Sequence, residues 1–316
     1  MSMKTIASTG AALLLTGCAT IQGLMSTGST PVVETIASYP HGTFLENVTV
    51  GRDDALTITS YFDRSLQRIA GASGGVLFSQ LDVHPVGIVQ GAQGFFVTAH
   101  GKAFTEGPEF TATNVILVLS NAGQEQARYA APDARFLNGA AVTSSGALLI
   151  ADSLAGAIWR FDPPTGALTE WLRDPLLAPN PAATGFALGA NGVKIHDGFV
   201  YVSNTSRQAL YRVRLSPSGT PEGPLEVFAE TGGIDDFSFA RDGSIYVATH
   251  QNSITRVSTA GAVETVLPAD CDGCTSVAFR GHGGAERLIV LTTGNWGEPG
   301  ETTPARVLSI ALPDMR

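Results

Sequence analysis

The chain has 316 residues, of which 44% are hydrophobic and 15% are charged, and its formal net charge is −9. This composition supports a large buried core and excludes both a disordered chain and a bundle of membrane helices. The acidic balance argues against nucleic acid as a partner, because its phosphates would be repelled. Thirty-six glycines and seventeen prolines favour many short strands joined by turns.

The N-terminal segment has the layout of an export signal. Lys4 is followed by an apolar run that ends in the tetrapeptide LTGC at Cys18, which resembles a bacterial lipobox and is too short to span a bilayer. We therefore expect residues 1–18 to be a lipoprotein-type signal peptide and 19–31, rich in Ser, Thr and Gly, to be a flexible tether. An ordinary cleaved signal is the alternative. Either case predicts a protein of the bacterial envelope, periplasmic or touching the membrane only through an N-terminal lipid anchor.

One hairpin pattern recurs along the remaining chain. The segment 233–250 contains two short apolar strands joined by a turn at Arg241-Asp242-Gly243. The same pattern occupies 45–60, 85–100, 137–152, 190–204 and 274–293. The equivalent positions are 46, 86, 138, 191, 235 and 275, so subtraction gives spacings of 40, 52, 53, 44 and 40 residues. Repeats of about 40 to 50 residues without helical periodicity predict an all-β, six-bladed β-propeller over residues 32–316.

Both ends of this region alternate like strands. We expect 32–37 and 306–312 to pair in one blade, because such a closure leaves no open edge in the ring.

Two cysteines, Cys271 and Cys274, lie together between the fifth and sixth repeats. In an oxidising compartment they are expected to form a local disulfide, with a free thiol pair as the alternative.

Four of the six equivalent positions carry a side-chain oxygen. The first strand of each blade lines the central channel of a propeller, so Glu46, Asn138, Asn191 and Asp235 should converge there. Two carboxylates and two amides suit one divalent cation, with Ca²⁺ preferred and Zn²⁺, Mg²⁺ or Mn²⁺ as alternatives. Asn and Asp beside glycine are also common turn residues, and this remains the competing interpretation.

These residues resemble a known family. Glu46 in LEN, Asn138 in RFLNG, Asn191 in ANGV and Asp235 in IDDF match, in order and in blade, the metal-binding motifs of the SMP-30/gluconolactonase/luciferin-regenerating family. The resemblance implies a six-bladed propeller that hydrolyses a lactone or a related ester at one divalent metal. An arginine that some members carry two residues before the first Asn is offset here to Arg135, which puts sugar-lactone specificity in doubt.

The chemistry assigns a role to each candidate. A bound cation would polarise the substrate carbonyl, and Asp235 is predicted to be the general base or a pure ligand. Asp236 should point to the other face of its strand and be structural. The second strand of each hairpin returns to the metal-bearing end, which predicts substrate contacts for the following pocket residues: His84, His100, Arg135, Asp152, Asn204 and His250.

Two further functions remain open. The chain is alternatively a non-catalytic envelope propeller that binds a ligand or partner, or a phosphotriesterase that polarises a P=O group. The GxSxG match at 71–75 is rejected as a nucleophile elbow, because a strand-like segment follows it where that motif needs a helix.

Overall fold

The computed structural model describes residues 31–71, 74–107, 109–184, 187–267, 271–281, 286–297 and 302–312. The predicted signal peptide, Cys18 and the tether up to residue 30 lie outside these residues. Within the described stretches, no helix has both the length and the apolar character that a membrane crossing requires.

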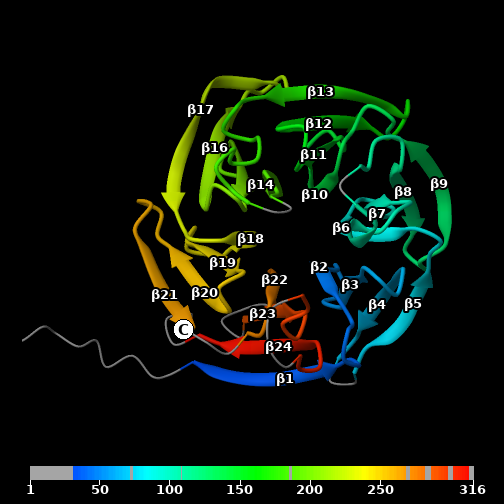
Figure 1. Ribbon diagram of the computed structural model, residues 1–316, viewed down its shortest axis with the longest axis vertical. Coiled ribbons are helices and arrows are strands. Elements are labelled where there is room, and N and C mark those ends of the chain that lie inside the picture. Colours follow the sequence, from blue (N-terminus) through cyan, green and yellow to red (C-terminus); the bar gives the residue numbers. More distant parts are fainter. Residues whose placement is uncertain are drawn as a thin grey trace, which may run out of the picture.

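Six four-stranded antiparallel sheets are arranged around a ring, which confirms the predicted six-bladed propeller (Figure 1). Blade 1 is β2 (Leu45–Val50), β3 (Leu56–Ser60), β4 (Ser65–Ile69) and β5 (Val76–Gln80); blade 2 is β6 (His84–Gln90), β7 (Gly94–His100), β8 (Asn114–Ser120) and β9 (Glu125–Ala130); blade 3 is β10 (Leu137–Val142), β11 (Leu148–Asp152), β12 (Ala157–Asp162) and β13 (Ala167–Arg173). Blade 4 is β14 (Ala190–His196), β15 (Phe199–Asn204), β16 (Ala209–Leu215) and β17 (Pro221–Glu230); blade 5 is β18 (Ile234–Phe239), β19 (Ile245–Thr249), β20 (Ser253–Val257) and β21 (Val263–Leu267); blade 6 is β22 (Cys274–Arg280), β23 (Arg287–Thr292), β24 (Arg306–Ala311) and β1 (Val32–Ser38).

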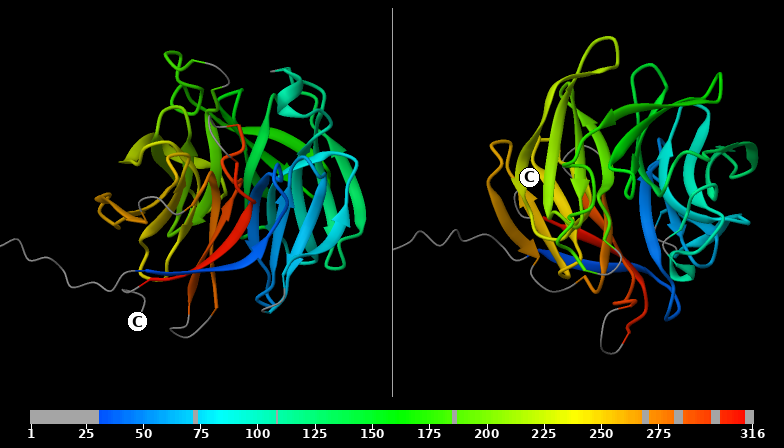
Figure 2. Two further views of the ribbon diagram at one scale, coloured as in Figure 1. Left: turned by 60° about the horizontal axis from the view of Figure 1, so that its bottom comes forward. Right: turned by 45° about the horizontal axis from the view of Figure 1, so that its top comes forward.

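The ring closes as predicted. β1 pairs antiparallel with β24, from Val32 opposite Ala311 to Ser38 opposite Arg306, so the first and last described strands share blade 6. Figure 2 shows these two strands side by side on the outside of the ring. A short 3-10 helix, η1 (Phe104–Glu106), follows β7. The rejected GxSxG segment leads into the strand β5; its Ser73 lies outside the described residues.

The hydrophobic core lies between neighbouring blades. Ile58 of β3 packs in one cluster with Ile289 of β23, and Leu149 of β11 packs in another with Val202 of β15. All four side chains are fully buried, and burial of each aliphatic side chain stabilises the fold by roughly 1.5–3 kcal/mol. Both faces of every blade are therefore committed to packing, which leaves the channel as the place for a site.

A β-bulge interrupts every inner strand near its start. In β2 the pairing jumps from Leu45↔Ser60 to Val48↔Ile58, so two residues, Glu46 and Asn47, lie opposite the single residue Thr59. The inner strands of the other five blades show the same jump at the equivalent place. Bulges of this kind redirect side chains next to functional sites.

Hydroxyl groups opposite three of the bulges tie adjacent inner strands together. Thr59 Oγ1 accepts a hydrogen bond from Asn47 N (2.8 Å) and donates one to Val86 O (2.9 Å) in the next blade. Thr98 makes the same link to Asn138 O at 2.7 Å, and Ser203 makes it to Asp235 O at 2.7 Å. These bonds fix the height of each inner strand relative to its neighbour.

Candidate functional site

The six equivalent positions found in the sequence are the first residues of the six bulges. Their strands β2, β6, β10, β14, β18 and β22 surround the centre of the ring (Figure 1). We call the face at which these strands begin the mouth. A cavity of about 480 Å³ opens there, and it is lined by Glu46, Asp235, Val86 and Thr275 among others.

Glu46 and Asp235 are two carboxylates that face one cavity and repel each other. Burial, followed by the charges of Asp235 and Asp236, raises the pKa of Glu46 well above its usual range. Burial also raises the pKa of Asp235 to about 6, although His250 Nε2, 3.4 Å from Asp235 Oδ2, opposes this shift. Such a pair would be relieved by a cation between its members.

The two predicted amide ligands occupy the bulges of blades 3 and 4. Asn191 Nδ2 donates to Asp235 Oδ1 (2.6 Å) and to Thr205 Oγ1 (3.0 Å), while Asn138 Nδ2 donates to Ser153 Oγ (3.2 Å). Each is only 3% exposed. The structure thus joins Asn191 to Asp235 directly, and it places Asn138 on the equivalent bulge of the adjacent blade.

Asp236 was expected on the other face of its strand from Asp235, and its carboxylate lies among polar side chains of the neighbouring inner strands. Its Oδ2 accepts hydrogen bonds from Asn47 Nδ2 (3.0 Å) and Ser276 Oγ (2.8 Å), and its Oδ1 forms an ion pair with Lys194 Nζ (2.7 Å). These residues come from four different inner strands, so they meet at the axis. The bulge is the reason, since it redirects the side chains of its two residues. The prediction that Asp236 is structural agrees with its full set of partners.

Three glycines occupy the second bulge position in the remaining blades. A Cβ at Gly192 would meet Asp236 Oδ1 at 2.4 Å, one at Gly139 would meet Asn191 O at 2.8 Å, and one at Gly87 would meet Asn138 O at 2.6 Å. The axis is therefore too narrow for six side chains at this level, and of the six second bulge positions only Asn47, Asp236 and Ser276 carry one.

The sequence predicted that residues at the ends of the second strands contact the substrate, but in the structure it is the residue after the end of the strand that lines the cavity. Six residues end the second strands and are all fully buried: Ser60, His100, Asp152, Asn204, Thr249 and Thr292. In the first blade, for example, Ser60 pairs with the core residue Leu45, and paired residues share one face of a sheet. The next residue faces the other way, and four such residues line the cavity: Tyr61, Thr205, His250 and Thr293.

Asp152 and Asn204 are accordingly corrected from substrate contacts to structural groups. The Asp152 carboxylate accepts hydrogen bonds from the backbone amides of Arg135 (2.8 Å) and Phe136 (2.9 Å) and from the indole of Trp159 (3.0 Å). Asn204 Nδ2 donates to two carbonyls that precede β14. Both side chains hold loops near the mouth, and neither lines the cavity.

His100 is corrected in the same way. Its Nε2 donates to Leu137 O at 2.9 Å, and its ring packs against Phe136, 4.2 Å away. Burial lowers the pKa of His100 to about 3, and within the described part of the chain its Nδ1 has no hydrogen-bond partner. His100 is thus a neutral packing residue.

Of the other three predicted pocket residues, only His250 lines the cavity. His84 donates from Nδ1 to Tyr61 O (3.1 Å), with its ring 5.0 Å from that of Tyr61. Arg135 donates from Nη1 to Leu154 O (3.3 Å). Neither residue is among those that line the cavity, and Arg135 is exposed.

An aromatic wall was missed by the sequence analysis. We define it as Phe44, Phe104 and Trp296, whose ring centroids lie 5.4–5.6 Å apart and which all line the cavity. A signal was present in the repeat. Two residues before the bulge, blades 1 to 3 carry Phe44, His84 and Phe136, whereas blades 4 to 6 carry glycine.

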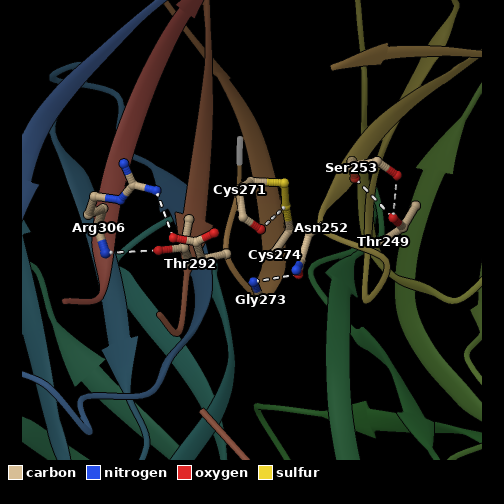
Figure 3. The surroundings of a disulfide bond; sticks show 9 residues. Thr249, Asn252, Ser253, Cys271, Gly273, Cys274, Thr292 and Arg306 are labelled. Atoms are coloured by element: carbon tan, nitrogen blue, oxygen red, sulfur yellow. Dashed lines mark hydrogen bonds and ion pairs between the residues drawn. A yellow bond between two sulfur atoms is a disulfide. The ribbon is translucent and has the colours of Figure 1, made fainter. Parts of the chain in front are cut away.

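Cys271 and Cys274 form a disulfide whose Cα atoms are 5.4 Å apart, in the link that the sequence predicted (Figure 3). Between them, Gly273 N donates to Asn252 Oδ1 (2.8 Å), and Gly273 itself lines the cavity. The adjacent Asp272 accepts hydrogen bonds from Thr303 Oγ1 (2.9 Å) and Arg306 Nη2 (3.3 Å). The disulfide thus holds one edge of the mouth.

Among the described residues, no group of three or more His, Cys, Asp or Glu side chains is arranged to hold a metal ion. The predicted set is of another kind, because it combines two carboxylates with two amides.

Comparison with known proteins shows the fold but not a close relative. No family model matches the chain, and no curated protein matches it. Among solved structures, a luciferin-regenerating enzyme superposes with a TM-score of 0.67 at 15% identity, covering 89% of this chain and 95% of its own. A gluconolactonase from Xanthomonas campestris gives 0.64 at 15% identity, with 89% of each chain covered. A regucalcin from Agrobacterium tumefaciens, described as a calcium-binding protein, gives 0.62 at 17% identity and covers 90% and 94%. The chain shares the six-bladed propeller of these proteins.

Proposed function

We propose that this protein is a divalent-metal-dependent hydrolase of a small-molecule lactone or related ester. One observation carries the proposal: Glu46 and Asp235 face the same cavity, and no Lys or Arg side chain in the described part of the chain forms an ion pair with either. Lys194, on the adjacent inner strand β14, is already paired with Asp236. Two buried carboxylates without a protein cation make a site for an added one.

The donor set fits a hard cation. Glu46 and Asp235 would supply carboxylate oxygens, and Asn138 and Asn191 would supply amide oxygens, which are the ligands that Ca²⁺ takes. The Asn191 amide now donates to Asp235; turned over, it would present its oxygen beside the carboxylate instead. The calcium-binding regucalcin and the gluconolactonase share this fold, and both support the proposal. Zn²⁺, Mg²⁺ and Mn²⁺ remain alternatives to Ca²⁺.

A divalent cation in this site would supply polarisation of the substrate carbonyl and a lower pKa for a nearby water. Asp235 accepts the proton as that water attacks the carbonyl carbon. The C–O bond of the lactone or ester then breaks, and Asp235 returns the proton to the departing alkoxide oxygen. His250, 3.4 Å from Asp235 and 42% exposed, orients that carboxylate from the solvent side.

The test combines metal analysis with turnover. Purified protein should contain one equivalent of a divalent metal, and exhaustive chelation should abolish hydrolysis of simple lactones until Ca²⁺ is restored. Asp235→Asn should remove turnover while the protein stays folded. Asp197→Asn is the matched control, because Asp197 is 88% exposed in a turn remote from the mouth. Full activity after removal of all metal would refute the proposal.

The same experiment separates the alternatives. Faster hydrolysis of phosphotriesters than of carboxylic esters would favour a phosphotriesterase. Absence of both metal and turnover would favour a non-catalytic propeller that binds a ligand or partner at its mouth. Export to the bacterial envelope and lipidation of Cys18 stay predictions; labelling with a radioactive fatty acid, lost in Cys18→Ala, tests them.

A further inference from the structure

The wall of the cavity carries little that would recognise a charged or sugar-like substrate. Phe44, Phe104 and Trp296 form one side, and Ala183, Ala187 and Leu188 contribute to the lining from the segment before β14. The cavity volume of about 480 Å³ is ordinary for a small-molecule site. Its walls are thus mainly apolar above a floor that carries the two carboxylates.

Among the described lining residues, the hydroxyl groups of Tyr61, Thr205, Ser206 and Thr275, four of six, already form hydrogen bonds within the protein. Thr275 Oγ1 donates to Leu45 O (2.7 Å), Thr205 Oγ1 accepts from Asn191 (3.0 Å), and Ser206 Oγ accepts from Asn180 N (2.9 Å). A polyhydroxylated substrate would lose its hydrogen bonds to water on binding, and this surface offers few hydrogen-bond partners to replace them. Unpaired hydroxyl groups on a buried ligand weaken its binding.

The charges of the lining point the same way. Its described members include Glu46, Asp235 and His250 but no Lys or Arg. A divalent cation would be balanced by the two carboxylates, which would leave no net positive charge to attract an anion. A carboxylate- or phosphate-bearing substrate therefore gains nothing from this wall.

We propose, resting on the hydrolase function above, that the substrate is an uncharged lactone or ester with an alkyl or aromatic group that packs against Phe44, Phe104 and Trp296. The aromatic wall acts as the specificity determinant, and the reacting carbonyl lies over the carboxylates. Sugar lactones and anionic lactones are poor substrates.

Binding can be measured apart from turnover. The probe is 3-pentylcyclopentanone, a ketone with the shape of γ-nonalactone but with no bond to hydrolyse, and its polar counterpart is 1,5-anhydroglucitol. Titration calorimetry on the metal-loaded protein should detect the ketone and not the polyol. Trp296→Ala should weaken ketone binding roughly 5- to 30-fold, the usual result of removing a buried aromatic anchor. Phe104→Leu, which keeps a large apolar side chain, should weaken it less. Leu77→Ala is the matched control, because Leu77 is 59% exposed on the outer strand β5.

Turnover gives the second measurement. The value of kcat/KM should be higher for γ-nonalactone than for glucono-1,5-lactone, and Trp296→Ala should raise KM for the former. Equal or better turnover of the sugar lactone, with no response to Trp296→Ala, would overturn this inference while leaving the hydrolase in place. Ketone binding without hydrolysis of any lactone would overturn the hydrolase and support the apolar ligand class. Failure to bind the ketone would overturn the inference directly.

Discussion

Replacement of Asp235 by asparagine should stabilise the metal-free protein at neutral pH. Burial raises the pKa of Asp235 from 3.8 to about 6, so the folded state binds this proton more tightly than the unfolded state does. The free energy of unfolding therefore falls as the pH rises. The destabilisation caused by ionising Asp235 is absent below pH 3.8, grows between pH 3.8 and 6, and is complete above pH 6. At about 1.4 kcal/mol per pH unit, the ionised group lowers the free energy of unfolding by about 3 kcal/mol. Asparagine removes this charge and can still accept the hydrogen bond from Asn191.

Urea denaturation of metal-stripped protein at pH 7.5 and pH 4 measures the effect. We expect the free energy of unfolding of Asp235→Asn to be about 3 kcal/mol higher than that of the parent at pH 7.5, and the two values to be equal near pH 4. The substitution Asp236→Asn at the adjacent position is the matched control. It should lower the free energy of unfolding by about 1–3 kcal/mol at pH 7.5, because it leaves Lys194 without its ion-pair partner. Added Ca²⁺ should stabilise the parent and not Asp235→Asn. A loss of stability in Asp235→Asn at pH 7.5 would show that the carboxylate is structural and that the reasoning is wrong.

Three further outcomes follow from the structure. Burial lowers the pKa of His100 to about 3, so this residue alone should contribute a fall of about 2 kcal/mol in the free energy of unfolding from pH 6.5 to 4.5. In urea titrations, the change in the free energy of unfolding between these two pH values should therefore differ by about 2 kcal/mol between the parent and His100→Gln. Gly139→Ala should lower the free energy of unfolding by about 2 kcal/mol, because its Cβ would press on Asn191 O. Gly233→Ala should leave the free energy of unfolding unchanged, since the nearest atom to an added Cβ, His250 Cβ, is 3.8 Å away. Equal losses of stability in the two variants would contradict this reasoning. Replacing Cys271 and Cys274 by serine should lower the melting temperature, with a loss of about 2 kcal/mol for so short a loop, and a reductant should then have no further effect.

The repeat made the fold predictable from the sequence. Each blade carries its own strands and turns, so six weak local patterns at similar spacing were enough to give blade number, strand order and closure by 32–37 with 306–312. The gathering of Glu46 and Asp235 at the mouth of the channel followed from the same symmetry. Glu46, Asn191 and Asp235 meet as that symmetry required.

Side-chain direction could not be predicted as well. A bulge changes the facing of each residue after it, and no residue type in this sequence marks its place: the bulged pairs range from Val86-Gly87 to Asp235-Asp236. Asp152 and Asn204 were therefore predicted at the correct end of their strands but on the wrong face, because each pairs with the residue before the bulge. Of the aromatic wall, only Phe44 occupies a repeated position; Phe104 and Trp296 lie in connecting segments outside the repeated hairpins, where the repeat makes no prediction.

The pairing of β1 with β24 also determines the face of the propeller at which β1 begins. β24 begins at Arg306, whose backbone N–H is held by Thr292 at the mouth, and it runs away from the mouth to Ala311. β1 is antiparallel to it, so Val32, next to Ala311, emerges on the opposite side of the disc. The segment before β1 therefore joins the propeller on the face opposite the mouth, so a lipid attached at Cys18, as the sequence predicts, would leave the opening of the cavity uncovered.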